Sequence, residues 1–308
     1  MPAESPHISV VILNWNRPED TLQAVRSVLG QSCADLEVVV WDNASTDGSR
    51  EVLTDAFASD PRVRLVWSER NYGVAGGRNR AFAAARGRIL FSLDSDAVIE
   101  TRDGLDLVAA VFENEPGVGV VGAEVLRPDR HLMWPFARPA SEWRERRFDT
   151  IRLDGCAFAT RRELFERIGG FAEHFSPYGQ EDHYYAFQVL GAGFRVVYVP
   201  AIKVVHAFNP VGRQGEQFAM VVRNGLWIPL ELFPFPHNLL RAVSRSMHFA
   251  REAAEDKQWR FFFQGFSQGF AAMRRRRPMP RKAWRRVAAL IREDKALGKA
   301  YDTGNVHG

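Results

Sequence analysis

The sequence predicts an α/β fold, in which a mostly parallel β-sheet is flanked by helices and followed by a C-terminal helical region. Short apolar runs of five to eight residues alternate with stretches whose apolar residues recur at helical spacing. Strands and helices that alternate in this way build βαβ units. The 308 residues are 46% hydrophobic and 25% charged, so the chain can bury a large core.

The candidate strands are apolar runs bounded by polar or turn residues. One of them, Ile89-Leu90-Phe91, leads through Ser92 and Leu93 into Asp94-Ser95-Asp96, and apolar residues resume at Ala97. We take this stretch as the centre of the fold. Strands are expected at residues 8–13, 36–41, 63–67, 89–93, 118–125, 155–160 and 194–199.

Helices are expected between these strands. Pro18 suits a first helical position, Glu19 and Asp20 follow where the helix dipole favours negative charge, and Gly30 ends the pattern. After the glycine-rich segment 71–79, an alanine-rich helix is expected to run to about residue 86. Further helical faces are expected at residues 52–57, 107–112, 164–168 and 181–190.

The alternation of strands and helices stops at residue 127. Residues 127–150 contain three prolines and two tryptophans and show no clear period. A long irregular stretch inside a domain is usually a functional loop, although a surface excursion without consequence is the alternative. The character changes again at residue 214. We therefore expect a catalytic domain at residues 1–213 and a helical region at residues 214–308.

The C-terminal region is basic and interleaves aromatic residues with arginines. Residues 251–308 contain 14 Lys+Arg and 6 Asp+Glu, whereas residues 1–250 are mildly acidic. Arg274–Arg277 and the apolar residues before them suit an interfacial helix on anionic lipid. Nucleic-acid binding is a weaker interpretation, and a solvated basic face is the alternative without a partner.

Several classes of protein are excluded by composition. Cys33 and Cys156 are the only cysteines, so a disulfide scaffold or a cysteine-ligated zinc site is not expected. The N-terminal apolar run is too short for a signal peptide, and no apolar segment of about 18 residues suggests a spanning helix. We therefore expect a cytoplasmic protein that associates peripherally with the inner face of the cell membrane.

Asp94 and Asp96 are the first candidate site. They follow a buried strand, and ligands of open α/β sheets bind at the carboxyl ends of strands. Two carboxylates there can share Mg²⁺ or Mn²⁺, which in turn holds a diphosphate, whereas the alternative is a solvated turn. Asp42 is at the end of the strand at residues 36–41. It could reach the same crevice and bind a ribose or base, or it could cap the turn after it.

Two further stretches carry candidate residues. In the segment Asn71–Asn79, glycines would let the backbone approach a ligand and Arg78 could pair with phosphate. Because the segment is not GxGxxG, it argues against a dinucleotide oxidoreductase, and the alternative is a tight connection. Glu181-Asp182 begins a helix and could supply a general base, or merely suit the helix dipole. His206 could add a nitrogen ligand to the cation, or be structural.

Taken together, these motifs resemble the family 2 glycosyltransferases, which have the GT-A fold, and in particular their rhamnosyltransferase-like members. The resemblance covers about residues 8–210, and several motifs in the family's order are more specific than any one alone. The motifs are VVILNWNRPEDTLQAVRSVLGQ, VVVWDNASTDGS, NYGVAGGRNRA, LFSLDSDAVI, GCAFATRRELFERIGGF and GQED.

The resemblance implies a role for each residue. Asp96 would be the direct ligand of a divalent cation, Asp94 would approach the ribose and the metal, and His206 would complete the metal shell. Asp182 would be the catalytic base, and Glu181 would bind or orient the acceptor. Arg78 would lie near the diphosphate, and Asp42 would contact the base. The remaining nucleotide-sugar positions are Leu13, Asn14, Asn16, Asn43, Asn71, Gly73, Gly77 and Ser95.

The chain departs from the family at one motif. Relatives often continue Glu-Asp-x-Asp-Leu-x-x-Arg, whereas Tyr184, Tyr185 and Gln188 stand at the last three of these positions here. Contacts to the acceptor and the donor sugar are therefore expected to differ. Residues 127–150 and 178–188 are expected to decide the acceptor.

The implied function is metal-dependent, inverting transfer of a hexosyl or deoxyhexosyl group. The donor would be a UDP- or dTDP-sugar, and the acceptor a hydroxyl of a glycan or glycolipid in cell-envelope polysaccharide synthesis. The rival enzyme class is a nucleotidyltransferase with the same kind of sheet, whose N-terminal glycine-rich signature is absent here. A rival of a different class is a non-catalytic assembly module at the membrane surface. Nucleic acid is not expected as a partner.

Overall fold

The computed structural model describes residues 7–133, 144–207 and 214–304, and the side chains among them up to residue 294. Within these residues, nine strands form a single sheet. The strands are β1 (Ile8–Asn14), β2 (Leu36–Asp42), β3 (Val63–Trp67), β4 (Ile89–Asp94), β5 (Ala97–Ile99), β6 (Val118–Leu126), β7 (Phe148–Asp149), β8 (Ala157–Arg161) and β9 (Arg195–His206).

Helices connect most of the strands, and four more helices follow the last strand. The expected strands and the helices between them are confirmed to within a few residues, apart from the end of β9 and the start of α3. The helices are α1 (Pro18–Leu29), α2 (Ser49–Phe57), α3 (Gly73–Ala84), α4 (Gly104–Asn114), α6 (Arg162–Ile168), α7 (Glu181–Gly191), α8 (Glu216–Leu232), α9 (His237–Glu255), α10 (Trp259–Gly269) and α11 (Arg281–Gly304), with 3-10 turns η1 (Glu173–Phe175) and η2 (Phe270–Arg275).

The α/β class is confirmed, and the sheet has a parallel half and a mixed half. Its strand order is β3-β2-β1-β4-β8-β6-β9-β5, with β7 paired to β9. The strands from β3 to β4 all run parallel, as expected. Beyond β4 the sheet is mixed, because β8 runs antiparallel to both β4 and β6. Within the parallel half, Leu13 lies beside Asp94 and Asn14 beside Asp42, so the predicted polar residues share one edge.

Two predicted boundaries were wrong. The strand that we expect at residues 194–199 continues to His206. Its last residues pair antiparallel with β5, so that His206 lies opposite Ala97. The glycine-rich segment is also not a loop before a helix, since α3 already begins at Gly73. Residues 134–143 of the irregular stretch lie outside the described residues.

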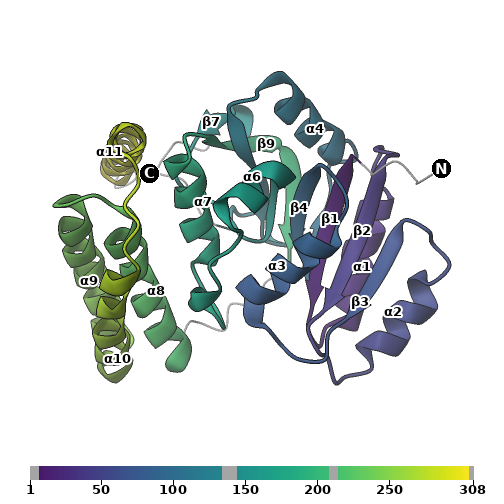
Figure 1. Ribbon diagram of the computed structural model, residues 1–308, viewed down its shortest axis with the longest axis horizontal. Helices are drawn as coiled ribbons and strands as arrows, with labels where there is room; N and C mark the ends of the chain where they lie inside the picture. The colour runs from purple at the N-terminus through teal and green to yellow at the C-terminus, as the bar shows by residue number, and fades with distance from the viewer. Residues whose placement is uncertain (1–6, 134–143, 208–213, 305–308) are drawn as a thin grey trace.

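Helices cover both faces of the sheet (Figure 1). Apolar residues of α1, α2 and α4 pack on one face with those of β1, β2 and β4. The other face is covered by α3, α6 and α7, and α8 and α11 belong to the same apolar cluster. Figure 1 shows the C-terminal helices at the end of the molecule opposite β3 and α2. None of the helices in the described part of the chain is long and apolar enough to cross a bilayer.

The C-terminal region is helical as expected, but its first helix is not amphipathic. Almost every residue of α8 from Phe218 to Leu232 is buried, because the helix lies between α7 and α10. The arginine run that we expected to face an anionic partner is divided. Arg275 donates to the buried carboxylate of Glu231 at 2.9 Å, and Arg276 donates to the last carbonyls of α8. Only Arg274 and Arg277 of the four are exposed.

The contact between α8 and α10 depends on a residue without a side chain. A Cβ atom at Gly265 would collide with the carbonyl oxygen of Ala219 and lie 2.8 Å from the Cβ of Val222. A backbone oxygen cannot move aside by changing a rotamer. Gly265 therefore sets how closely the two helices approach.

We predict that Gly265→Ala destabilises the protein by up to about 2 kcal/mol. Alanine in a helix would ordinarily add about 1 kcal/mol of stability, but forcing atoms into a packed contact costs roughly 1–3 kcal/mol. Urea unfolding followed by circular dichroism measures the change. Gly117→Ala is the control, because a Cβ there meets no atom within 4 Å. Equal midpoints for the two variants would contradict the close helix packing.

Candidate active site

The predicted site residues gather around one cleft of about 1120 Å³ at the carboxyl edge of the parallel strands. Its walls come from the ends of β1 and β4, the loop before β8, the start of α7 and one face of α9. Asp94, Ser95, Asp96, Arg78, Glu181, Asp182 and His206 all line it. The fold thus unites motifs that are more than a hundred residues apart in the chain.

Asp96 lies between two cationic or potentially cationic side chains. Its Oδ1 is 2.9 Å from Nε2 of His206, and its Oδ2 accepts a hydrogen bond from Arg17 at 2.5 Å. Burial opposes ionisation of Asp96, but these contacts hold its pKa below the ordinary value. Burial likewise opposes the charge on His206, whose pKa is nevertheless raised by Asp96 and Asp94. The pair is therefore favoured as carboxylate and imidazolium.

These side chains fit a divalent cation. Nε2 of His206 is 2.9 Å from Oδ1 of Asp96 and 4.0 Å from Oδ2 of Asp94, so the imidazole lies close to both carboxylates. Oxygen donors with one imidazole nitrogen suit Mn²⁺ or Mg²⁺. The thiol of Cys156 also lies within 4.8 Å of Asp94 and His206. Burial and the nearby carboxylates raise the pKa of that thiol, so it stays protonated and is a poor ligand for a hard cation.

Arg78 lies at the wall of the cleft and is almost fully buried against the carboxylates. It donates to Asp94 at 2.6 Å, to Glu181 at 3.2 Å and to the carbonyl of Gly155 at 2.9 Å. Only 5% of its side chain is exposed. A buried arginine with two carboxylate partners positions both of them, because leaving either charge unpaired would be costly. The predicted contact between Arg78 and a diphosphate stays a prediction.

Glu181 and Asp182 have opposite pKa shifts at the start of α7. Burial and the charge of Asp182 raise the pKa of Glu181. Burial would also raise the pKa of Asp182, but the charge and hydrogen bonds of His183 lower it. Asp182 also accepts a hydrogen bond from the backbone N–H of Gly155 at 3.0 Å. An ionised Asp182 beside a more readily protonated Glu181 is the arrangement that a general base requires.

Asp42 is at the predicted strand end, but its carboxylate is engaged within the protein. It is 4% exposed and accepts hydrogen bonds from Asn14 at 2.8 Å and from the hydroxyl and N–H of Ser45. The side-chain oxygen of Asn14 accepts from Thr21, and that of Asn16 accepts from the N–H of Thr46. These residues stabilise the loop after β2 and lie behind the wall of the cleft. Their proposed contacts to a nucleotide stay predictions.

The asparagines and glycines of the third motif shape the wall of the cleft. Asn43 donates to Asn71 at 2.8 Å and accepts from the N–H of Tyr72, which fixes the start of α3. Gly73 has a positive φ of 70°. A Cβ at Gly77 would lie 2.7 Å from Leu13, so this glycine lets α3 pack closely on β1. Leu13, Asn43, Asn71 and Gly73 line the cleft.

Sequence reasoning missed several residues of the site. Arg17 precedes the proline that begins α1, and nothing local indicates that it reaches Asp96. Asp154 lies in the loop before β8, where its carboxylate accepts from the N–H of Cys156. Burial and the charge of Asp182 raise the pKa of Asp154 to about 6. The one signal for Asp154 in the sequence was its position shortly before the strand β8. The wall contributed by α9 had no signal in the sequence.

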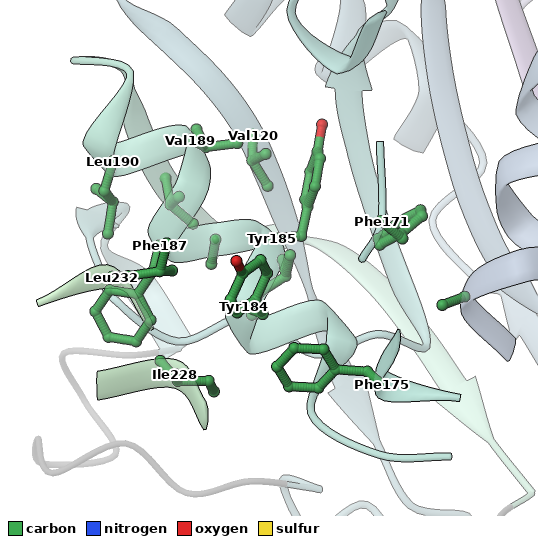
Figure 2. Packing of buried hydrophobic residues seen from close by; sticks show 14 of the residues in the cluster. Val120, Phe171, Phe175, Tyr184, Tyr185, Phe187, Val189, Leu190, Ile228 and Leu232 are labelled. Atoms are coloured by element: carbon green, nitrogen blue, oxygen red, sulfur yellow. The ribbon is translucent and has the colours of Figure 1, made fainter. Parts of the chain in front are cut away.

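The three residues that depart from the family motif, Tyr184, Tyr185 and Gln188, do not line the cleft. Tyr184 donates to Glu231 at 2.9 Å, and the hydroxyls of Tyr185 and Thr160 are 2.8 Å apart. Figure 2 shows both tyrosines among the aromatic side chains of Phe171 and Phe175. They bind α7 to the core and to α8.

The arrangement of strands, helices and carboxylates defines a transferase of the GT-A type. Comparison with known families agrees. The description "Glycosyl transferase family 2" matches residues 9–169, which is more than half of the chain. The protein therefore belongs to glycosyl transferase family 2. A second description, "N-terminal domain of galactosyltransferase", matches residues 138–210.

Individual relatives are more distant. The putative teichuronic acid biosynthesis glycosyltransferase TuaG of Bacillus subtilis is 38% identical over 91 residues, which are 30% of this chain and 36% of TuaG. The match thus spans about a third of that relative. Among solved structures, the mannosyltransferase PcManGT of Pyrobaculum calidifontis, in complex with GDP-Man and Mn²⁺, has a TM-score of 0.58 at 21% identity. The match covers 88% of this chain and 86% of the PcManGT chain.

A second solved structure extends the likeness to the C-terminal helices. S. aureus TarS 1-349 in complex with UDP has a TM-score of 0.62 at 18% identity. The match covers 98% of this chain and 93% of the TarS chain. At this identity the likeness concerns the fold, and it confirms the predicted GT-A architecture.

We predict that Asp154→Asn stabilises the protein at pH 7.5 when chelator is present. Because the raised pKa belongs to the folded state, the folded protein keeps a proton between about pH 4 and 6 that the unfolded chain has released. Stability is therefore lost as the pH rises through this window. A shift of about two units corresponds to at most about 3 kcal/mol. Asparagine does not ionise, so the variant should not lose this stability as the pH rises. Its side-chain oxygen can still accept the hydrogen bond from the N–H of Cys156.

Urea unfolding at several pH values measures the effect. The advantage of Asp154→Asn should be largest at pH 7.5 and should disappear near pH 4. Asp55→Asn, an exposed change on α2, is the control and should show no such trend. A pH-independent difference between Asp154→Asn and wild type would contradict the raised pKa.

Proposed function

We propose that this protein transfers a sugar from a nucleoside-diphosphate sugar to an acceptor hydroxyl, with inversion at the anomeric carbon and with Mn²⁺ or Mg²⁺ as cofactor. One observation carries the proposal. Asp94, Asp96 and His206 converge at the edge of the same cleft in which Asp182 and Glu181 begin α7. A cation site and a candidate base thus face one space large enough for a nucleotide-sugar. Family membership supports the reaction class.

The donor side is assigned to the ends of β1 and β4. Asp94, Asp96 and His206 would hold the cation, which when bound neutralises negative charge on the departing diphosphate. Arg78 keeps Asp94 in place from below. Leu13, Asn43 and Asn71 form the neighbouring wall, where we place the nucleoside. We favour a uridine or thymidine donor, in keeping with the UDP bound by TarS.

Asp182 is assigned as the general base. Its lowered pKa keeps it ionised near neutral pH, and the N–H groups of Gly155 and His183 fix its orientation. In a single displacement it would take the proton of the acceptor hydroxyl as that oxygen attacks the sugar, whose transition state resembles an oxocarbenium ion. Glu181, next to it and paired with Arg78, would orient the acceptor.

We assign the acceptor to a glycan or glycolipid of the cell envelope. TuaG is named for teichuronic acid biosynthesis, which supports polysaccharide synthesis as the context. We further propose that the protein works at the inner face of the cell membrane as a peripheral protein.

Calorimetric titration with UDP, dTDP, GDP and their sugars tests the donor site. We expect one pyrimidine nucleotide to bind with Mn²⁺ and to bind at least tenfold more weakly with chelator. Asp96→Ala should weaken binding in Mn²⁺ to the level that wild type shows with chelator, because a ligand of the cation is lost. Asp55→Asn should bind like wild type. Absence of nucleotide binding under all conditions would refute the donor site.

The base is tested by Asp182→Asn. This variant should lose at least about a thousandfold in transfer rate, the scale of a missing general base together with disturbed acceptor orientation, and should keep wild-type nucleotide affinity. Nuclear magnetic resonance of the product of the wild-type enzyme should show the inverted anomer. Full activity of Asp182→Asn, or retained configuration, would refute the mechanism.

A further inference from the structure

Exposed apolar side chains are concentrated in one short part of the chain. Of the eleven large hydrophobic residues that are exposed in the described structure, nine fall within residues 235–273. Large apolar patches on a protein surface usually mark a binding surface. The nine are Phe235, Leu239, Leu240, Val243, Met247, Trp259, Phe263, Phe270 and Met273.

On α9 these residues form a stripe along one side of the helix. Leu239, Val243 and Met247 recur every four residues, and Leu240 is one heptad before Met247. They are 44–64% exposed. The inner side of the same helix packs through Phe249 and Ala253 onto α8 and α10. The stripe therefore remains uncovered after the helix has packed.

A second stripe runs along α10. Trp259, Phe263 and Phe270 are exposed, and Phe266 between them is partly buried. Trp259 is stacked on Phe263 at 6.0 Å and Phe266 lies against Phe270 at 5.2 Å, and the two pairs are joined through the buried ring of Phe262. Figure 1 shows α9 and α10 side by side at one end of the molecule. Two neighbouring helices thus present apolar stripes to solvent.

The charges around these stripes are mainly positive. Between residues 235 and 282, seven exposed side chains are basic and two, Glu255 and Asp256, are acidic. Amphipathic helices with tryptophan and phenylalanine on the apolar side and arginine or lysine beside it bind anionic lipid surfaces. The basic residues are Arg251, Lys257, Arg260, Arg274, Arg277, Arg281 and Lys282.

The other side of α9 faces the catalytic cleft. Arg245, His248 and Glu252 line the cleft, and Arg245 donates to Gln180 at 3.0 Å. Gln180 immediately precedes Glu181 and Asp182. One helix therefore carries the exposed apolar stripe on one side and a wall of the cleft on the other.

We propose that α9 and α10 form a docking surface for an anionic lipid bilayer, which we call the α9–α10 face (the nine exposed apolar residues with the seven basic ones). Docking there places the acceptor side of the cleft next to the lipid headgroups, where an acceptor with an apolar tail is held. The membrane contact itself is independent of the reaction, whereas its meaning for the acceptor rests on the proposed transferase function.

The same charges argue against a second copy of this chain as the occupant. In a two-fold symmetric dimer, the patch would meet an identical patch. Seven basic groups against two acidic ones on each side would then repel one another. An anionic surface satisfies both the apolar stripes and the basic border.

Vesicle flotation of the full-length protein tests the α9–α10 face. Phosphatidylcholine vesicles, with and without about a third of phosphatidylglycerol, are the two probes. We expect flotation with the anionic vesicles, little with the neutral ones, and a marked decrease at about 0.5 M salt, where charges are screened. Leu240→Glu/Val243→Glu should reduce the bound fraction at least tenfold. Thr54→Glu/Ala56→Glu, on exposed positions of α2, is the matched control and should float like wild type.

Three results would overturn the proposal. They are equal flotation with neutral and anionic vesicles, unchanged flotation of the Leu240→Glu/Val243→Glu variant, and a wild-type dimer in gel filtration that this variant converts to a monomer. Because the substituted residues are exposed and lie outside the cleft, the variant should bind nucleotides like wild type. Loss of flotation with intact nucleotide binding therefore separates this proposal from the proposed function.

Discussion

The site depends on the burial of one guanidinium among carboxylates. Arg78 joins α3 to the end of β4 through Asp94, to the start of α7 through Glu181 and to the loop before β8 through Gly155. An arginine so deeply buried is stable only while its anionic partners stay in place, and each of them is stable only while the arginine does. The geometry of the metal-binding edge and that of the proposed base are therefore mutually dependent. The ion pairs of Arg78 with Asp94 and Glu181 stabilise the wall of the cleft in addition to apolar packing.

Local patterns predicted most of the fold, because strands and helices in this chain follow their expected periods. They also placed Asp94 and Asp96 at the end of a strand and Asp182 at the start of a helix, whereas the role of Asp182 came from the family resemblance. Local patterns could not show that β9 continues to His206, since the pairing with β5 that supports its last residues joins segments about a hundred residues apart. Nor could they show that Arg17 reaches Asp96, which only the close approach of β1 and β4 allows.

Other differences have the same kind of cause. Asp42 is at the expected strand end, but a carboxylate so close to a turn finds N–H and hydroxyl partners in that turn. Tyr184 stands where relatives often have aspartate, and it is explained by Glu231, a buried carboxylate on α8 that needs a donor. In each case a buried polar group takes the nearest partner that the tertiary fold supplies. The spacing of motifs carries no information about that partner.

The two walls of the cleft come from different parts of the chain. Residues 9–169, which match the family description, contain Asp94 and Asp96, whereas α7 and α9, which carry Asp182 and Arg245, come after them. Under the proposed function, substitutions on α9 would change the wall near the acceptor and leave Asp94 and Asp96 at the other wall unchanged. Exchange of α9 alone would therefore be the way to redirect the enzyme to another acceptor, because Asp182 and His206 would stay in place.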